Sequence, residues 1–199
     1  MRLENYCVLK SSGTMREIIE NRFTHCRQKG CINIYPEPVS YYADPPGEGW
    51  VCRVPDEDFD PERHFTVYNS GERNIHLVAI DKCLIGRNKQ IRKRCDCVFF
   101  EERDVCFVEF KLRAEGREHE DDRNQQTRLE EAAEQLLQTI QLFEEEGLLT
   151  NEHRVRAYAF VGYGPLYPAP TTTLVYLAEY LDSNIRSAID FDAKDSVIF

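Results

Sequence analysis

Two acidic residues and a lysine stand within short apolar stretches and could together hold a metal ion. Asp96 lies in the segment CDCVFF, and Glu109 and Lys111 lie in the segment VCFVEFKL shortly after it. Charged residues are seldom placed among apolar ones for packing alone, so these positions indicate a site. Carboxylates, together with a backbone carbonyl that we assign to Phe110, are the hard oxygen ligands that Mg²⁺ or Mn²⁺ prefers.

The chemistry that suits such a set is hydrolysis of a phosphate ester. A bound metal lowers the pKa of a water molecule and offsets negative charge in the transition state. Alternation along a strand sends Glu109 and Lys111 to the same face, where the lysine could orient the water or stabilise the same charge. A Glu-x-Lys pair is also common as a simple surface ion pair, so the pattern needs support from the surrounding elements.

Hydrophobic patterning predicts the elements that position these residues. Residues 74–81, 95–100 and 105–112 are rich in β-branched and aromatic residues and are predicted strands, with a polar turn between the second and the third. An apolar stripe at spacings of three and four predicts a helix over residues 126–146, and Gly147 stands where a helix commonly ends. The metal-binding residues would then lie on neighbouring strands packed against a helix.

The rest of the chain is less regular. We expect a short helix over residues 11–22 and a further strand over 155–163, while residues 171–184 fit either a strand or a helix. The segment 30–72 is rich in Pro, Gly, Tyr and Asp and is predicted to form loops and short strands, and 113–127 an exposed polar loop. The aromatic residues of the first of these segments could stack on bases, but packing beneath the loop is the favoured interpretation: Tyr35, Tyr41, Tyr42 and Trp50.

The order of these parts resembles the PD-(D/E)xK nuclease superfamily. The resemblance rests on RKRCDCVFF, then VCFVEFK, then AAEQLLQTI, and it covers residues 74–163. It implies that Asp96 and Glu109 are metal ligands, that Lys111 is the catalytic lysine, and that Gln135 is an auxiliary residue near the phosphate or the metal-bound water. A solvent-facing position on the helix is the alternative for Gln135, because glutamine is frequent in this stretch.

The resemblance also implies a fold and a further ligand. We expect one α/β domain over residues 1–199, with a restriction-endonuclease-like core of α-β-β-β-α-β order, a mixed central sheet flanked by helices, and a loop-rich insertion at about 30–72. An upstream helical glutamate often completes such a site, and Glu17 or Glu20 is the candidate here. The chain departs from the family pattern in lacking a proline before Asp96. It also has a bulky residue between Glu109 and Lys111, and a leucine where glycine is frequent after the lysine.

Composition limits the classes of protein. With 199 residues and 42% apolar content, the chain can form one sizeable core. No apolar run is long enough to span a bilayer and no secretory signal is evident, so we expect a cytoplasmic protein with no membrane partner. The net charge of −10 disfavours a protein that simply coats nucleic acid, but one basic cluster precedes Asp96 and could bind a phosphate backbone or be a solvated surface: Arg87, Lys89, Arg92, Lys93 and Arg94.

Eight cysteines do not by themselves indicate a disulfide framework in a chain of this size, and reduced thiols are expected. Cys95 and Cys97 are two residues apart and should fill space on one face of a strand. Cys26 and Cys31, next to His25, lack the matching second pair of a zinc site, although a zinc-stabilised interaction module stays a minor alternative. Asp81, at the end of the first predicted strand, is interpreted as a turn former rather than a second-shell acid.

The sequence therefore predicts a Mg²⁺- or Mn²⁺-dependent nuclease that acts on DNA or, less favoured, on RNA. The alternative is a nuclease-like domain that binds nucleic acid or a protein partner without cutting. Many nucleases dimerise to cut two strands, so a homodimer is an open alternative to a monomer.

Overall fold

A six-stranded mixed sheet forms the centre of the fold. The computed structural model describes residues 14–47, 49–85, 93–112, 122–161 and 171–199. The strands of this main sheet lie in the order β1 (Ile32–Tyr35), β5 (Ile75–Ala79), β6 (Cys97–Glu101), β7 (Asp104–Phe110), β8 (Arg154–Phe160) and β9 (Ile189–Ala193). Neighbouring strands from β1 to β7 pair antiparallel, whereas β7, β8 and β9 run parallel.

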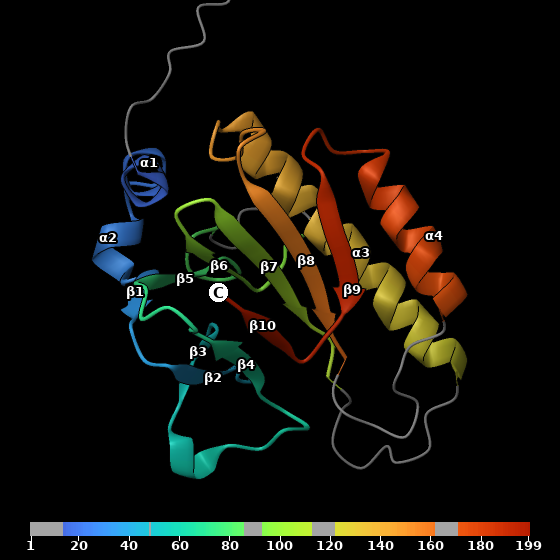
Figure 1. Ribbon diagram of the computed structural model, residues 1–199, viewed down its shortest axis with the longest axis horizontal. Coiled ribbons are helices and arrows are strands. Elements are labelled where there is room, and N and C mark those ends of the chain that lie inside the picture. The colour runs from blue at the N-terminus through green and yellow to red at the C-terminus, as the bar shows by residue number, and fades with distance from the viewer. Residues whose placement is uncertain (1–13, 48, 86–92, 113–121, 162–170) are drawn as a thin grey trace, which may run out of the picture.

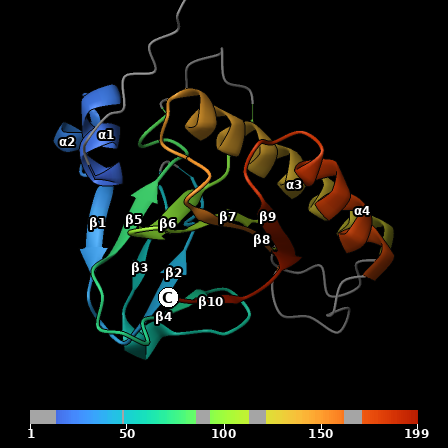
Figure 2. The same ribbon diagram turned by 45° about the horizontal axis from the view of Figure 1, so that its top comes forward.

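Helices supply the connections that the parallel strands need. Helix α3 (Asp122–Glu145) joins β7 to β8, and α4 (Thr171–Asp182) joins β8 to β9. Both lie on the same face of the main sheet (Figures 1 and 2). Their buried residues, such as Leu129, Leu136 and Leu181, form one core with Val105 and Phe107 of β7. Helices α1 (Met15–Arg22) and α2 (Cys26–Lys29) contribute to this core beside β5.

A second, four-stranded sheet covers the other face of the main sheet. Its strands lie in the order β10 (Ser196–Ile198), β4 (Phe65–Tyr68), β2 (Val39–Ala43) and β3 (Cys52–Val54). A short 3₁₀ helix, η1 (Asp56–Asp58), follows β3. The two sheets share an aromatic core in which Phe65 packs against Phe99, Phe110 and Phe160, with ring centroids 5.9–6.3 Å apart.

The observed order of elements agrees with the coarse prediction of a mixed α/β fold. Helix α1 is followed by β5, β6 and β7, then by α3 and β8, as predicted, with β1 to β4 inserted after the first two helices. Residues 171–182 are helical, which settles the segment that periodicity left open. The segment 30–72 forms the short strands expected of it, and its aromatic residues pack: Tyr42 is fully buried and Tyr41 stacks on Phe59.

Several boundaries differ from the predictions. Helix α3 begins at Asp122 rather than at about 126, because the polar residues that were assigned to a loop continue the helix. Strand β7 ends at Phe110, although the Lys111 amide still donates to the Phe160 carbonyl at 2.8 Å. Residues 11–13, 113–121 and 162–163 of the predicted elements lie outside the described residues.

Two predictions about the cysteines are wrong. Cys31 and Cys83 form a disulfide, because the Ala79 amide donates to the Cys31 carbonyl and brings their Cα atoms to 5.6 Å, within the usual range for a disulfide. Cys95 and Cys97 lie in the cores on opposite faces of the main sheet, because β6 begins only at Cys97 and alternation does not extend back to Cys95. Cys26 is a buried free thiol.

No helix in the described ranges is both long and apolar enough to cross a membrane.

Candidate active site

Asp96 and Glu109 bring two carboxyl groups together inside the protein. Asp96 immediately precedes β6 and is 8% exposed, and Glu109 lies in β7 and is 2% exposed. The Phe110 amide donates a hydrogen bond to Asp96 Oδ2 at 2.7 Å, which joins the start of one strand to the end of the next. The antiparallel pairing of β6 with β7 therefore places the two predicted ligands side by side.

Lys111 completes the predicted trio. Its Nζ lies 3.0 Å from Glu109 Oε1 and 3.9 Å from Glu131 Oε2 on α3. Glu109 Oε2, by contrast, is buried and has no hydrogen-bond partner among the described residues. A buried carboxylate oxygen without a donor is costly unless a cation or a proton satisfies it.

The pKa values of both acids are raised, which also indicates that the site favours an added cation or proton. Burial raises the pKa of Asp96 to about 7, and the nearby charge of Asp44 raises it further, against the hydrogen bond from Phe110. Burial also raises the pKa of Glu109 well above its usual range, and the charge of Asp96 adds to this, whereas Lys111 opposes it. Two carboxylates in this position are therefore costly to ionise together without an added positive charge.

Gln135 and Thr139 hold α3 against the segment that leads to Asp96. Gln135 Nε2 donates to the Arg94 carbonyl at 2.9 Å, and the Cys95 amide donates to Thr139 Oγ1 at 2.8 Å. The Thr139 hydroxyl in turn donates to the Gln135 carbonyl at 2.9 Å. In the structure Gln135 thus positions the segment that leads to Asp96. The sequence alone left a solvent-facing position equally open, because glutamine is frequent in this stretch.

The turn after β5 anchors Asp96 from the other side. The amides of Ile80 and Asp81 donate to the Asp96 carbonyl at 2.8 and 3.3 Å. The Asp81 side chain accepts a hydrogen bond from Arg94 Nε at 2.5 Å. Asp81 therefore lies in a turn, as expected. It also forms a partly buried ion pair with Arg94, which the sequence did not indicate.

Asp44 and Lys82 are charged residues near the site that the sequence analysis missed. Lys82 Nζ lies 3.9 Å from Asp44 Oδ1. The charges of Lys82 and Lys111 both lower the pKa of Asp44, although its burial raises that pKa more. Asp44 follows β2, in the segment 30–72, so only the packing of the second sheet brings it here. The sequence carried no signal beyond an acid before two prolines.

The helical glutamates proposed as further ligands, Glu17 and Glu20, have other partners in this structure, and their role as ligands stays a prediction. Glu17 caps α1: its carboxylate accepts from the Thr14 amide at 2.9 Å in a capping box. Glu20 accepts hydrogen bonds from Arg16 and Arg27, which lower its pKa. The partners of both carboxylates are residues close in the chain: Thr14 and Arg16 at the start of α1, and Arg27 on α2.

The basic cluster before Asp96 is only partly described. Lys93 forms an ion pair with Glu134 on α3, and Arg94 pairs with Asp81. Arg87, Lys89 and Arg92 lie outside the described residues. The two described members are therefore ion-paired to the protein itself.

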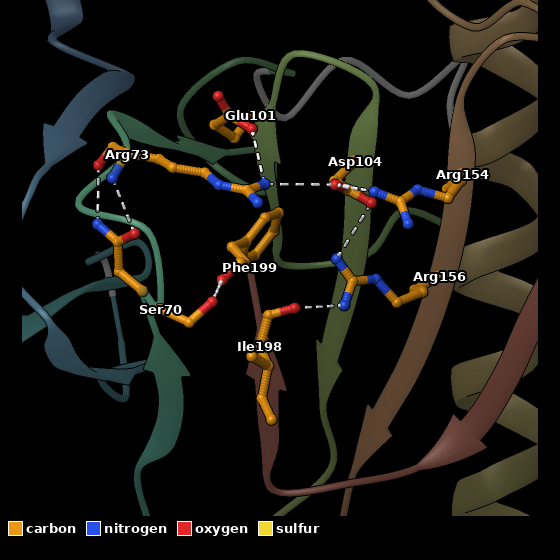
Figure 3. A network of polar contacts seen from close by, with 9 residues as sticks. Ser70, Arg73, Glu101, Asp104, Arg154, Arg156, Ile198 and Phe199 are labelled. Atoms are coloured by element: carbon orange, nitrogen blue, oxygen red, sulfur yellow. Dashed lines mark hydrogen bonds and ion pairs between the residues drawn. The ribbon is translucent and has the colours of Figure 1, made fainter.

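A second buried acid, Asp104, lies at the opposite end of β7 and provides a contrast. Arg154 donates to Asp104 Oδ2 at 2.6 Å, and guanidinium nitrogens of Arg73 and Arg156 lie 3.7 and 3.8 Å from its carboxylate (Figure 3). Arg156 also donates to the Ile198 carbonyl at 2.8 Å, which ties β10 to β8. Asp104 is satisfied by protein cations, whereas the far oxygen of Glu109 is not.

The described ranges contain no group of three or more His, Cys, Asp or Glu side chains arranged to hold a metal ion. At the candidate site, the buried carboxylates of the described residues are the pair Asp96 and Glu109. Comparison of the chain with protein-family models, with curated proteins and with solved structures found no match.

Proposed function

We propose that this protein is a Mg²⁺- or Mn²⁺-dependent phosphodiesterase that cuts nucleic acid, with DNA as the favoured substrate. The observation that carries the proposal is Glu109, a buried carboxylate with one oxygen on Lys111 and the other without a partner among the described residues, beside the buried carboxyl of Asp96. The proposal includes a restriction-endonuclease-like core of the PD-(D/E)xK type, which the order of α1, β5 to β7, α3 and β8 supports.

The oxygen ligands at the candidate site suit a hard divalent cation such as Mg²⁺. Mg²⁺ commonly uses one or two carboxylates and completes its shell with waters and substrate phosphate oxygens, so a pair of acids is sufficient. Asp96 and Glu109 would supply these carboxylates, and the Phe110 carbonyl stays a candidate third ligand because the Asp96 carboxyl already lies against the Phe110 backbone. A divalent cation would also offset the cost of ionising both buried acids.

A metal in this position would supply a water of lowered pKa and would stabilise charge on phosphate oxygens. Hydrolysis would form a bond from the water oxygen to phosphorus and break the bond to the leaving oxygen, and the proton lost by the water would be balanced by the proton that the leaving oxygen takes up. Glu109 holds the Lys111 ammonium at 3.0 Å, so that this cation can offset negative charge that develops during the reaction. Gln135 and Thr139 keep the Asp96 segment in place and are positioning residues in this scheme.

The test is cleavage of plasmid, linear and single-stranded substrates with Mg²⁺ or Mn²⁺. We expect Glu109→Gln and Lys111→Ala each to abolish metal-dependent cleavage. Glu17→Gln and Glu20→Gln serve as controls, because each makes the same Glu→Gln change on helix α1, where the carboxylate has other partners, and both variants should cut as the wild type does.

Two results would contradict the proposal. Cleavage that survives Glu109→Gln would show that another site acts. A folded wild type that binds nucleic acid or a partner but cuts no substrate would favour the alternative, a nuclease-like domain that binds without catalysis.

A further inference from the structure

Lys82 has an unusual backbone conformation next to the candidate site. Its φ angle is 64°, in the left-handed region that a side chain with a Cβ seldom adopts. It stands in the tight turn between Asp81 and Ile85, which form an isolated bridge. Strained residues of this kind persist only where their surroundings hold them, and they are more frequent at functional sites.

The surroundings do hold this turn. On one side of Lys82, the Asp81 amide donates to the Asp96 carbonyl and the Asp81 carboxylate pairs with Arg94. On the other side, Cys83 is fully buried and is linked to Cys31 by the disulfide. The backbone of Lys82 is thus held on both sides. On one side, Asp81 is hydrogen-bonded to the backbone of Asp96, a proposed metal ligand.

The side chain of Lys82 is only 22% exposed and is directed to Asp44. The separation of 3.9 Å is an ion pair but too long for a hydrogen bond, so the ammonium makes no hydrogen bond within the described part of the chain. Its three N–H donors are therefore available to another acceptor.

Asp44 connects Lys82 to the buried acids electrostatically. Its pKa is affected by both Lys82 and Lys111, and its own charge raises the pKa of Asp96. The geometric link is the hydrogen bond from the Asp81 amide to the Asp96 carbonyl, which holds the turn that carries Lys82 beside the segment of a proposed metal ligand.

We infer that Lys82 binds a phosphate group of the nucleic-acid strand beside the one that is cut, and that Asp44 holds its ammonium when no strand is bound. The inference rests on the proposed function and names a residue that binds its substrate. A phosphate oxygen can accept the charge-assisted hydrogen bond that Asp44, at its present distance, does not make. The fixed turn would then set which part of the backbone reaches the metal.

Substitutions at the two ends of one ion pair separate this role from a structural one. The probe is a fluorescein-labelled oligonucleotide of mixed sequence, as a single strand and as a duplex, with binding measured by anisotropy. Ca²⁺ replaces Mg²⁺ so that the strand stays intact. Lys82→Gln should weaken binding on the order of tenfold and lower the slope of log affinity against log salt by about 0.9. Lys82→Arg should restore most of the binding.

Asp44→Asn breaks the same ion pair but should strengthen binding, because it removes a negative charge that competes with phosphate. Arg103→Ala is the matched control: Arg103 is ion-paired with Glu152 at 3.2 Å in the turn before β7, at the end of that strand away from Glu109. We expect its removal to change binding little. Melting temperatures of all variants check that each is folded.

Equal weakening by Lys82→Gln and Asp44→Asn would show that the pair is structural and would overturn the role of Lys82. Weakening by Arg103→Ala as large as that by Lys82→Gln would overturn it too, since any surface cation would then suffice. In both cases cleavage by the wild type would leave the nuclease proposal standing. A wild type that neither binds nor cuts would instead overturn the proposed function and the role of Lys82 with it.

Discussion

Replacing Asp96 with asparagine should stabilise the metal-free protein at pH 8 and not at pH 4. The pKa of Asp96 is raised by burial from the usual 3.8 to about 7. Because the folded pKa lies above the unfolded one, the stability linked to this group is fully present below about pH 4 and is lost as the pH rises through 7. Each pKa unit corresponds to about 1.4 kcal/mol, so the loss is about 4 kcal/mol.

Asparagine does not ionise and can still accept the hydrogen bond from the Phe110 amide at 2.7 Å through its Oδ1. At pH 4 the folded wild type also presents a neutral, protonated Asp96, so we expect Asp96→Asn to change stability there by about 0–1 kcal/mol of loss. The pKa of about 7 already includes the hydrogen bond from Phe110, so the full linkage of about 4 kcal/mol applies at pH 8, where Asp96→Asn should gain about 3–4 kcal/mol over the wild type.

The measurement is urea unfolding in EDTA across this pH range, followed by the fluorescence of Trp50, the single tryptophan, which packs against the core. Asp104→Asn is the control: Asp104 is a buried acid in β7, the strand that pairs with β6, but its carboxylate is ion-paired with Arg154 and Arg156, so losing this charge should destabilise the protein at pH 8. Added Mg²⁺ should stabilise the wild type and have little effect on Asp96→Asn.

A change in the free energy of unfolding that is the same at pH 4 and pH 8 would refute this reasoning. Destabilisation by Asp96→Asn at pH 8 would refute it too, because the ionised carboxylate would then stabilise the metal-free protein.

Further predictions concern the supports of the site. Reducing the Cys31–Cys83 disulfide, which closes a separation of 52 residues, should lower stability by about 4 kcal/mol in urea unfolding with and without reductant. Thr139→Val leaves the buried Cys95 amide without its acceptor, so it should cost about 1–3 kcal/mol by the same assay and reduce cleavage, whereas Thr139→Ser should do neither. Phe65→Ala should cost about 3–5 kcal/mol, because this ring packs between the two sheets; loss of less than 1 kcal/mol in thermal or urea unfolding would mean that the second sheet is not part of a shared core.

Local pattern was sufficient for the elements that carry the candidate site. The alternation of apolar residues around Glu109 predicted a strand with two different faces, and the structure places Val105 and Phe107 in the core under α3, and Val108 and Phe110 in the core under the second sheet. The apolar stripe of α3 was readable for the same reason: burial of one face imposes a period on the sequence.

Contacts between distant segments were not readable in this way. The Glu20 carboxylate appeared suited to a metal by its place on an early helix, yet two arginines occupy it. Asp44 gave no signal, because a loop residue is placed by the packing of its neighbours and not by a repeating pattern. The Cys31–Cys83 pairing likewise depends on how β1 lies against β5.

The amino-acid sequence by itself determined the three antiparallel strands β5, β6 and β7, the helix α3 and the strand β8, and it determined that Asp96, Glu109 and Lys111 would lie in or beside two neighbouring strands. These features depend on interactions between residues close in the chain and on a hydrophobic period that burial requires. Only the tertiary structure decided that Glu109 keeps an oxygen without a partner among the described residues, that Gln135 supports the backbone before Asp96, and that Lys82 pairs with Asp44. Each of these depends on which distant segments come into contact, and that is settled by the packing of the whole core.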